Sequence, residues 1–463
     1  MSFLSDNLAL LMFVALGAGI FCGLPVAVVL TGVGLGFGLV GCAVGWMRLT
    51  DFGAIYHRVY GTLSDSEDIM WAAVPLLIFM GAVLEGSGTA RDFLTVLQRL
   101  LRRVPGGLAI AVTLIGILLA PAAGMVGASV ATLALIALPT LLERGYPPSL
   151  AAGTVAAAGT LGVGMPPGIM LFFLADAMGM QVPFIYLAMV GPALVLLGLY
   201  VVYYVLACRD LPPPVSPVDN ARMTGAAILR DLVAPGALVG LVLASVIAGW
   251  ASLSESAAIG AASAVALALA ARRLRRGLLD QAVGRTTIMT AMVFFIFVGA
   301  SIFSLVFRLL GGVARVAGFL TDLHLGNWGT LLLVLAVIFV LGCFIDWLEI
   351  VLISFVIFRP VLDALDFTGH IDQPYLAFGW ITVLVALTLQ SSFLTPPFGF
   401  ALFFLRGSAP PGVRMVHIYR GVLPFIVIQL LAIACVAAFP AIATWLPDRL
   451  LDLRAPRTIK AWD

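Results

Sequence analysis

Long apolar runs recur along the whole chain, from Leu8 to Phe439, and no polar stretch between them is large enough to form a soluble domain. A helix needs about 20 apolar residues to cross the hydrocarbon core of a bilayer. Backbone amides inside a bilayer must be satisfied within the segment, which favours helices for runs of this length. Only 10% of the residues are charged, against about 25% in soluble domains. The sequence therefore predicts an all-α polytopic membrane protein.

Composition and missing motifs argue against other classes of protein. The formal net charge is +2 and no basic-aromatic run occurs, so no nucleic-acid partner is expected. The sequence lacks H-E-x-x-H, paired-aspartate and G-x-S-x-G motifs, so we predict no enzymatic activity and no cofactor. The five cysteines show no C-x-x-C spacing and are interpreted as packing residues. The first apolar run lacks a basic n-region, which predicts a retained span.

Two short motifs occur twice in the same order. IFMGA (78–82) pairs with IFVGA (296–300), and the segment 165–176 pairs with 395–407. Two matches in register indicate a duplicated unit, a common origin of transporter folds. We therefore expect a first repeat over 1–208, a cytoplasmic Pro-rich linker over 209–231, a second repeat over 232–447 and a polar tail over 448–463.

Each half contains two apolar stretches that are interrupted by glycine and proline. In the first half, PAAG (121–124) and GAS (127–129) interrupt the stretch at about 107–142, and GTLGVGMPPG (159–168) interrupts the stretch at about 150–176. In the second half, GCFIDWLEI (342–350) interrupts about 330–362, and QSSFLTPPFG (390–399) interrupts about 377–405. Glycine permits non-helical torsions, and proline removes a backbone donor. We predict a re-entrant hairpin followed by a broken helix, once in each half.

The charges that flank the two hairpins differ in sign. Arginines flank the first hairpin, namely Arg99, Arg102, Arg103 and Arg144, whereas acids flank the second, namely Asp322, Asp363, Asp366 and Asp372. Because positive residues favour the cytoplasmic side, the first hairpin is expected to enter from the cytoplasm and the second from the opposite face. The arginine-rich loop 271–285 is then cytoplasmic, and both termini are external. The two halves would have inverted topology.

Polar residues at these interruptions are candidates for a cation site. Hydroxyl groups stand beside the glycine-rich backbone at Ser129, Thr160, Ser391, Ser392 and Thr395, and broken helices expose carbonyl oxygens to cations. Asp346 and Glu349 are three residues apart in an apolar stretch, and would share a face of a helix. They are either a cation, proton or substrate site, or structural partners for Arg308 or Arg359. Glu85 and Glu255 are interpreted as capping or pairing residues.

Several long stretches resemble a known family. They include VPLLIFMGAVLEGSG (74–88), GASVATLALIALPTLLERGYPPSLAAGTVAAAGTLGVGMPPG (127–168) and LQSSFLTPPFGFALFFLRG (389–407). In this order they resemble the large membrane subunit of tripartite ATP-independent periplasmic (TRAP) transporters, the DctM-type permease, nearly end to end. The last stretch is most similar to the mannitol/chloroaromatic branch, some of whose members are associated with lactate and 2-oxo acids.

This resemblance implies an ion-transporter-superfamily elevator fold in the bacterial inner membrane. It further implies sodium-driven import of a small organic acid, with a separate four-span small subunit and a periplasmic binding protein as partners. By position, the sodium-site candidates are Gly124, Gly127, Ser129, Thr160, Gly162, Pro166, Gly342, Ser391, Ser392, Thr395 and Pro396, and no other metal is expected. The substrate or coupling candidates are Asp346, Glu349 and Gln390. The tip PAAGMVGAS departs from the serine-rich tip of many relatives.

Two other functions are compatible with the same spans. A stand-alone sodium/anion symporter of the related superfamily would need no binding protein. A passive channel or scaffold subunit would give uptake that does not respond to sodium. Genes for the two partner proteins beside this one would separate the first alternative from the tripartite assembly, and sodium dependence would separate the second.

Overall fold

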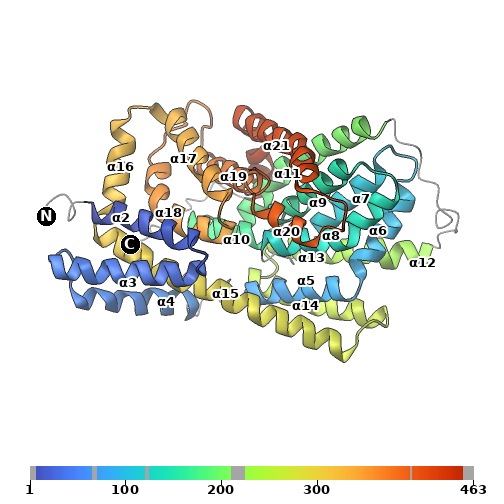
Figure 1. The fold of residues 1–463 in the computed structure, drawn as a ribbon, viewed down its shortest axis with the longest axis horizontal. Coiled ribbons are helices and arrows are strands. Elements are labelled where there is room, and N and C mark those ends of the chain that lie inside the picture. The colour runs from blue at the N-terminus through green and yellow to red at the C-terminus, as the bar shows by residue number, and fades with distance from the viewer. Residues whose placement is uncertain (1–6, 65–69, 120–124, 210–224, 397–398, 452–463) are drawn as a thin grey trace.

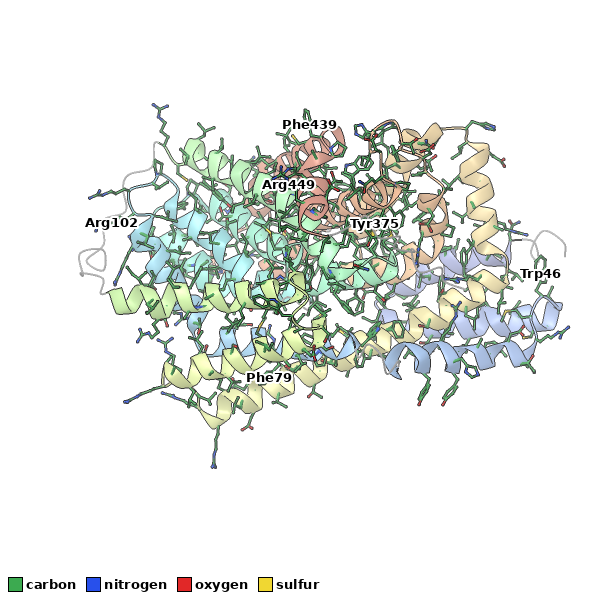
Figure 2. All side chains as sticks on the ribbon, turned by 180° about the vertical axis from the view of Figure 1, so that it is seen from behind. Trp46, Phe79, Arg102, Tyr375, Phe439 and Arg449 are labelled. Carbon is green, nitrogen blue, oxygen red and sulfur yellow. The ribbon has the colours of Figure 1, made fainter. Side chains whose placement is uncertain are left out.

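The computed structural model describes residues 7–64, 70–119, 125–209, 225–396 and 399–451, and these residues form helices and connecting loops without strands. Eight of the helices are long and apolar enough to cross a membrane, and four more are apolar but shorter. This confirms the predicted all-α polytopic fold. The molecule is elongated (Figure 1), and Arg102 and Trp46 lie at opposite ends of its long axis (Figure 2).

The first half begins with spans that lie outside the interrupted segments. Its helices are α2 (Leu8–Phe21), α3 (Val26–Val44), α4 (Gly53–Ser64), α5 (Ala73–Gly86) and α6 (Thr89–Leu100), with short 3-10 turns at Leu49–Phe52 and Met70–Ala72. The interrupted segments follow as α7 (Gly107–Leu118), α8 (Val126–Glu143), α9 (Pro148–Val163) and α10 (Ile169–Ala177), and α11 (Val182–Ala207) ends the half.

The second half repeats this order. It begins with α12 (Gly225–Ile228), the π-helical η5 (Leu229–Val233), α13 (Ala234–Ile247), α14 (Leu253–Ala270), α15 (Arg276–Leu309) and α16 (Gly312–Asp322). Its interrupted segments are α17 (Gly326–Gly342), α18 (Trp347–Asp363), α19 (Pro374–Ser392) and α20 (Phe400–Ser408), followed by α21 (Met415–Ala438) and α22 (Ala441–Leu450). Residues 225–231 of the expected linker are helical, and α22 runs into the expected polar tail.

Each predicted interruption falls between two helices, but each is shorter than predicted. Helix α7 has 12 residues, which at about 1.5 Å per residue cannot cross 30 Å of hydrocarbon. The prediction that GAS (127–129) is a break is wrong, because α8 begins at Val126. Helices α9 and α19 likewise continue to Val163 and Ser392. Burial of these helices outweighs the low helix propensity of glycine and serine, about 1 kcal/mol for glycine.

Helices α9 and α19 lie at the centre of the protein. Every residue from Leu150 to Val163 and from Leu376 to Ser392 is buried, so these helices are surrounded by protein on all sides. The hairpin helices and α21 pack around them, whereas α15 packs along α3 and α5. In Figure 1, α15 runs beneath the hairpin helices from the side of α14 and α5 to the side of α3 and α4. The breaks in α9–α10 and α19–α20 are thus shielded from lipid, as non-helical backbone in a membrane must be.

Glycine allows α9 and α21 to approach each other closely. A Cβ built on Gly153 would overlap the carbonyl oxygen of Gly421, and a Cβ on Gly421 would lie 2.9 Å from the Ser149 carbonyl carbon. Small residues of this kind permit close backbone contact between membrane helices.

Replacing Gly421 with leucine is therefore expected to destabilise the protein, by about 1–3 kcal/mol or more, because overpacking forces two backbones apart. Thermal unfolding of the purified protein measures this effect. Gly198→Leu on α11 is the control, since nothing lies within 4 Å of a Cβ at that position. Equal transition temperatures for the two variants would contradict the close packing of α9 and α21.

Candidate functional site

The second hairpin and the second broken helix meet at Gly342 and Ser392. A Cβ built on Gly342 would overlap the Oγ of Ser392 and would lie 2.6 Å from its Cβ. The last residue of α17 therefore touches the last residue of α19, and only glycine fits at this contact. The structure thus brings together two of the sodium-site candidates that the family resemblance implies, Gly342 and Ser392.

The break in the first half contacts the same end of α19. A Cβ built on Gly164, which follows the last residue of α9, would overlap the Oε1 of Gln390 and lie 3.2 Å from its Cδ. Pro166 lies in the same break, between α9 and α10. The interruption of the first broken helix and the C-terminal turn of the second therefore lie side by side. This juxtaposition connects the two halves of the chain at the centre of the protein.

Asp346 lies near the N-terminal ends of two hairpin helices, α18 and α8. It is the N-cap of α18, it is buried, and its Oδ1 accepts a hydrogen bond from the Trp347 amide (2.9 Å). The backbone amide of Val126, the first residue of α8, lies close enough to interact with the Asp346 carboxyl group. Helix N-termini carry a partial positive charge that stabilises anions. The carboxylate of Asp346 therefore connects the tip of the second hairpin to the tip of the first.

Glu349 and Gln390 have buried polar atoms without a partner among the described residues. Glu349 Oε2 and both terminal atoms of Gln390 are shielded from solvent and form no hydrogen bond there. Each buried polar group left unsatisfied costs about 1–3 kcal/mol, and such groups are rare in native proteins. Buried, unpaired polar atoms of this kind are what a bound cation or a polar ligand would satisfy.

The described part of the chain pairs neither acid with an arginine. Neither Asp346 nor Glu349 forms an ion pair with a described residue, and Arg359 pairs with Asp363 instead (3.6 Å). Glu85 and Glu255, in contrast, have the roles expected of them. Glu85 accepts hydrogen bonds from Arg285 (2.6 Å) and from Thr132 on α8 (2.7 Å). Glu255 forms a capping box with Ser252 at the start of α14.

The hydroxyl groups at the two breaks are arranged as acceptors. Ser391 and Ser392 donate to the carbonyl oxygens of Leu387 (2.8 Å) and Leu389 (2.6 Å). Thr395 and Thr160 likewise donate to the carbonyl oxygens of Ser391 and Ala157, each at 3.1 Å. Because the hydroxyl proton is already engaged, the lone pairs of each oxygen remain available to a cation. Hard cations are bound by such oxygen ligands together with carbonyl and carboxylate groups.

The remaining predicted residues are distributed between helices and breaks. Gly124 lies outside the described residues. Gly127 and Ser129 lie in the first turn of α8, where a Cβ on Gly127 would overlap the ring of Phe404. Gly162 lies in the last turn of α9, and Pro396 lies between α19 and α20.

Two groups beside Asp346 were not predicted. No sequence pattern identifies the Val126 amide, because every residue except proline has a backbone N–H group. Trp347, which is completely buried, has an indole Nε1 without a hydrogen-bond partner in the described part of the chain, and its ring lies 5.6 Å from that of Phe173 on α10. Trp347 directly follows Asp346 in the sequence, and this position could have identified it as a site residue. The indole N–H could donate to a bound anion.

Helices that span a membrane, paired hairpins and a buried polar site at their tips define a polytopic transport protein. The chain belongs to the family described as "Tripartite ATP-independent periplasmic transporter, DctM component", whose model matches residues 11–442. The family is a transporter permease, so the protein is not an enzyme, as predicted.

The names of the relatives that match this chain mention different substrates. The chain is 30% identical to the C4-dicarboxylate TRAP transporter large permease protein DctM of Pseudomonas aeruginosa, over 83% of this chain and 88% of the relative. It is 25% identical to the ectoine/5-hydroxyectoine TRAP transporter large permease protein UehC of Ruegeria pomeroyi, over 89% and 94%. Among solved structures, the YdaH transporter of Alcanivorax borkumensis matches with a TM-score of 0.57 at 15% identity, over 96% of this chain and 99% of that one. At this identity the last match shows the fold alone.

Proposed function

We propose that this chain is the permease of a sodium-driven importer of a small organic acid, with a 2-oxo or 2-hydroxy acid as the preferred substrate class. The observation that carries the proposal is the pair of buried acids Asp346 and Glu349, the latter with an unpaired oxygen, together with the buried, unpaired side chain of Gln390 on α19. Sodium supplies the positive charge that these groups lack. The family supports a role as the membrane subunit of a TRAP transporter.

The proposed mechanism is of the elevator type. Sodium binds where the hydroxyls of Ser392 and Thr395 face the tip of the second hairpin, and a second ion binds at the corresponding break of the first half. The hairpins and broken helices carry the ions and the acid past the helices around α15. A periplasmic binding protein delivers the acid, and a small four-span subunit in the bacterial inner membrane completes the assembly. A related permease of Oleidesulfovibrio alaskensis, whose name DctMQ joins both subunits, is 25% identical over 82% of this chain.

Proteoliposomes that contain this chain, the small subunit and the binding protein test the proposal. An inward sodium gradient is expected to drive accumulation of the acid carried by the binding protein, and collapse of the gradient is expected to stop it. Uptake that requires sodium but no binding protein would instead indicate a stand-alone symporter. Uptake that does not respond to sodium would indicate a passive channel.

Replacing Ser392 or Thr395 with alanine is expected to raise the sodium concentration for half-maximal uptake several-fold, because each change removes one oxygen ligand. Sodium titration of uptake at a fixed acid concentration measures the shift. Thr388→Ala is the matched control, since Thr388 lies on the same helix and donates the same kind of hydrogen bond, to Leu384 (2.7 Å). If Ser392→Ala and Thr388→Ala had the same sodium dependence, the ion would bind elsewhere.

A further inference from the structure

A cavity separate from the hairpin tips lies between α4 and α15 on one side and α10, α18 and α19 on the other. Its volume is about 1020 Å³, and neither Asp346, Glu349 nor Gln390 lines it. Three arginines on three different helices do line it: Arg58 on α4, Arg308 on α15 and Arg359 on α18. The orientation predicted from the charges, with the second hairpin entering from the periplasmic face, would place the cavity toward the periplasm.

The charge of Arg359 is already engaged. Its Nε lies 3.6 Å from Asp363 Oδ2, and its Nη1 donates to the carbonyl oxygen of Ala177 at the C-terminal end of α10 (3.3 Å). Asp366 at the edge of the cavity is also engaged, because the Thr368 amide donates to it (2.9 Å) and holds its pKa below the usual range. Arg359 therefore has the structural role of joining the second hairpin to the first broken helix.

The charges of Arg58 and Arg308, in contrast, have no such partners among the described residues. Both side chains are half-buried, and neither forms a hydrogen bond or an ion pair with any residue that the structure describes. Arg308 also experiences the positive charges of Arg58 and Arg359. Asp176 on α10 also lines the cavity, but its charge interacts with Arg359. Two half-buried cations that repel each other are stabilised by an anion that binds both.

The rest of the cavity wall suits a small amphiphilic anion. Apolar side chains line it beside the arginines, including Phe297, Val351 and Phe355, and the hydroxyl-bearing Ser301 and Ser304 are the nearest polar neighbours of Arg308 along α15. Guanidinium groups bind carboxylates through paired hydrogen bonds. The combination of an apolar wall with a few convergent polar groups is typical of a ligand pocket.

We propose that this cavity is a second substrate site, in which Arg58 and Arg308 bind the carboxylate of an organic acid on the periplasmic side of the hairpin tips. The choice of an organic acid rests on the proposed function. Because α4 and α15 form one wall and the hairpin helix α18 forms the other, an acid in the cavity contacts both groups of helices. The site would receive the acid before it reaches the buried groups around Asp346.

Saturation-transfer NMR on the purified permease tests binding without requiring transport. Lactate, pyruvate and succinate serve as probes, and the methyl or methylene protons of at least one are expected to show transfer from the wild-type protein. The variant Arg58→Gln/Arg308→Gln is expected to weaken that binding about tenfold or more, because two charge-assisted contacts are lost. Arg276→Gln, at the exposed opposite end of α15, is the matched control and is expected to bind as the wild type does.

Chemical protection provides a second test on the unmodified sequence, which holds even if the double variant fails to fold. Phenylglyoxal labels accessible arginines, and the bound acid is expected to slow labelling of Arg58 and Arg308 but not of Arg276, as quantified by peptide mass spectrometry. Absence of transfer from the wild type, equal transfer in the double variant, or equal protection of Arg276 would overturn the proposal. Loss of sodium-driven uptake with intact protection would instead disprove the proposed transport function alone.

Discussion

Replacing Asp346 with asparagine is expected to abolish sodium-driven uptake, with a loss of at least about tenfold. Asparagine is as good an N-cap as aspartate, so α18 keeps its first hydrogen bond, and only the negative charge is removed. A cation beside a carboxylate in a site of low dielectric gains several kcal/mol from this charge, and each 1.4 kcal/mol corresponds to about tenfold in affinity. Initial rates of uptake in proteoliposomes measure the loss.

The same variant separates a defect in sodium binding from a defect in folding. Sodium that binds the native state raises its free energy of unfolding, by about 2.7 kcal/mol at 100 times the dissociation constant. Thermal unfolding with and without sodium should therefore show stabilisation of the wild type and none for Asp346→Asn. Glu255→Gln, which changes an exposed capping acid, is the control and should keep both uptake and stabilisation. Sodium stabilisation that survives in Asp346→Asn would place the ion away from this carboxylate.

Replacing Gly342 with alanine is expected to reduce uptake by about tenfold or more. The added methyl group would overlap Ser392 Oγ and lie 2.6 Å from Ser392 Cβ, so the tip of the second hairpin could not close on α19. Protein interiors are densely packed, so a displaced hairpin tip also displaces the neighbouring groups that would bind sodium. Sodium titration of uptake and of thermal stability measures the effect. Gly407→Ala on α20, where a Cβ meets nothing within 4 Å, is the matched control.

A compensating change distinguishes loss of fit from loss of a ligand. Gly342→Ala/Ser392→Gly removes the overlapping side chain and should recover thermal stability through coupling between the two positions. It should not recover sodium affinity, because the Ser392 hydroxyl is then missing. Full recovery of sodium-driven uptake in the double variant would show that Ser392 serves only to pack against the hairpin tip. A Gly342→Ala protein with unchanged uptake would show that the tip need not contact α19.

The interrupted segments were predictable because their signals are local. Glycine and proline act on the backbone where they stand, and an apolar run too short to cross a bilayer must turn back or break. The ends of the breaks were less predictable. Gly127, Ser129, Gly162 and Ser392 have low helix propensity, yet all are helical because neighbouring helices bury them.

Individual members of the candidate site were predictable as residue types, but their partners were not. Asp346 and Glu349 were identifiable as acids in an apolar stretch, because such residues are costly in a membrane. The sequence left arginine pairing open, and among the described residues neither acid forms an ion pair, while Arg359 pairs with Asp363 four residues away. The contact of Asp346 with the Val126 amide joins residues more than 200 positions apart. No local pattern encodes such a contact.

The amino-acid sequence by itself determined that the chain is a helical membrane transporter with two hairpins and two broken helices, since hydrophobic run length and backbone chemistry are properties of short segments. Only the tertiary structure decided which breaks touch. It placed Gly342 against Ser392 and Gly164 against Gln390, left Glu349 without a partner, and gathered Arg58 and Arg308 around one cavity. The physical reason is that burial and pairing depend on contacts between helices that are distant along the chain, and those contacts arise from the packing of the whole protein.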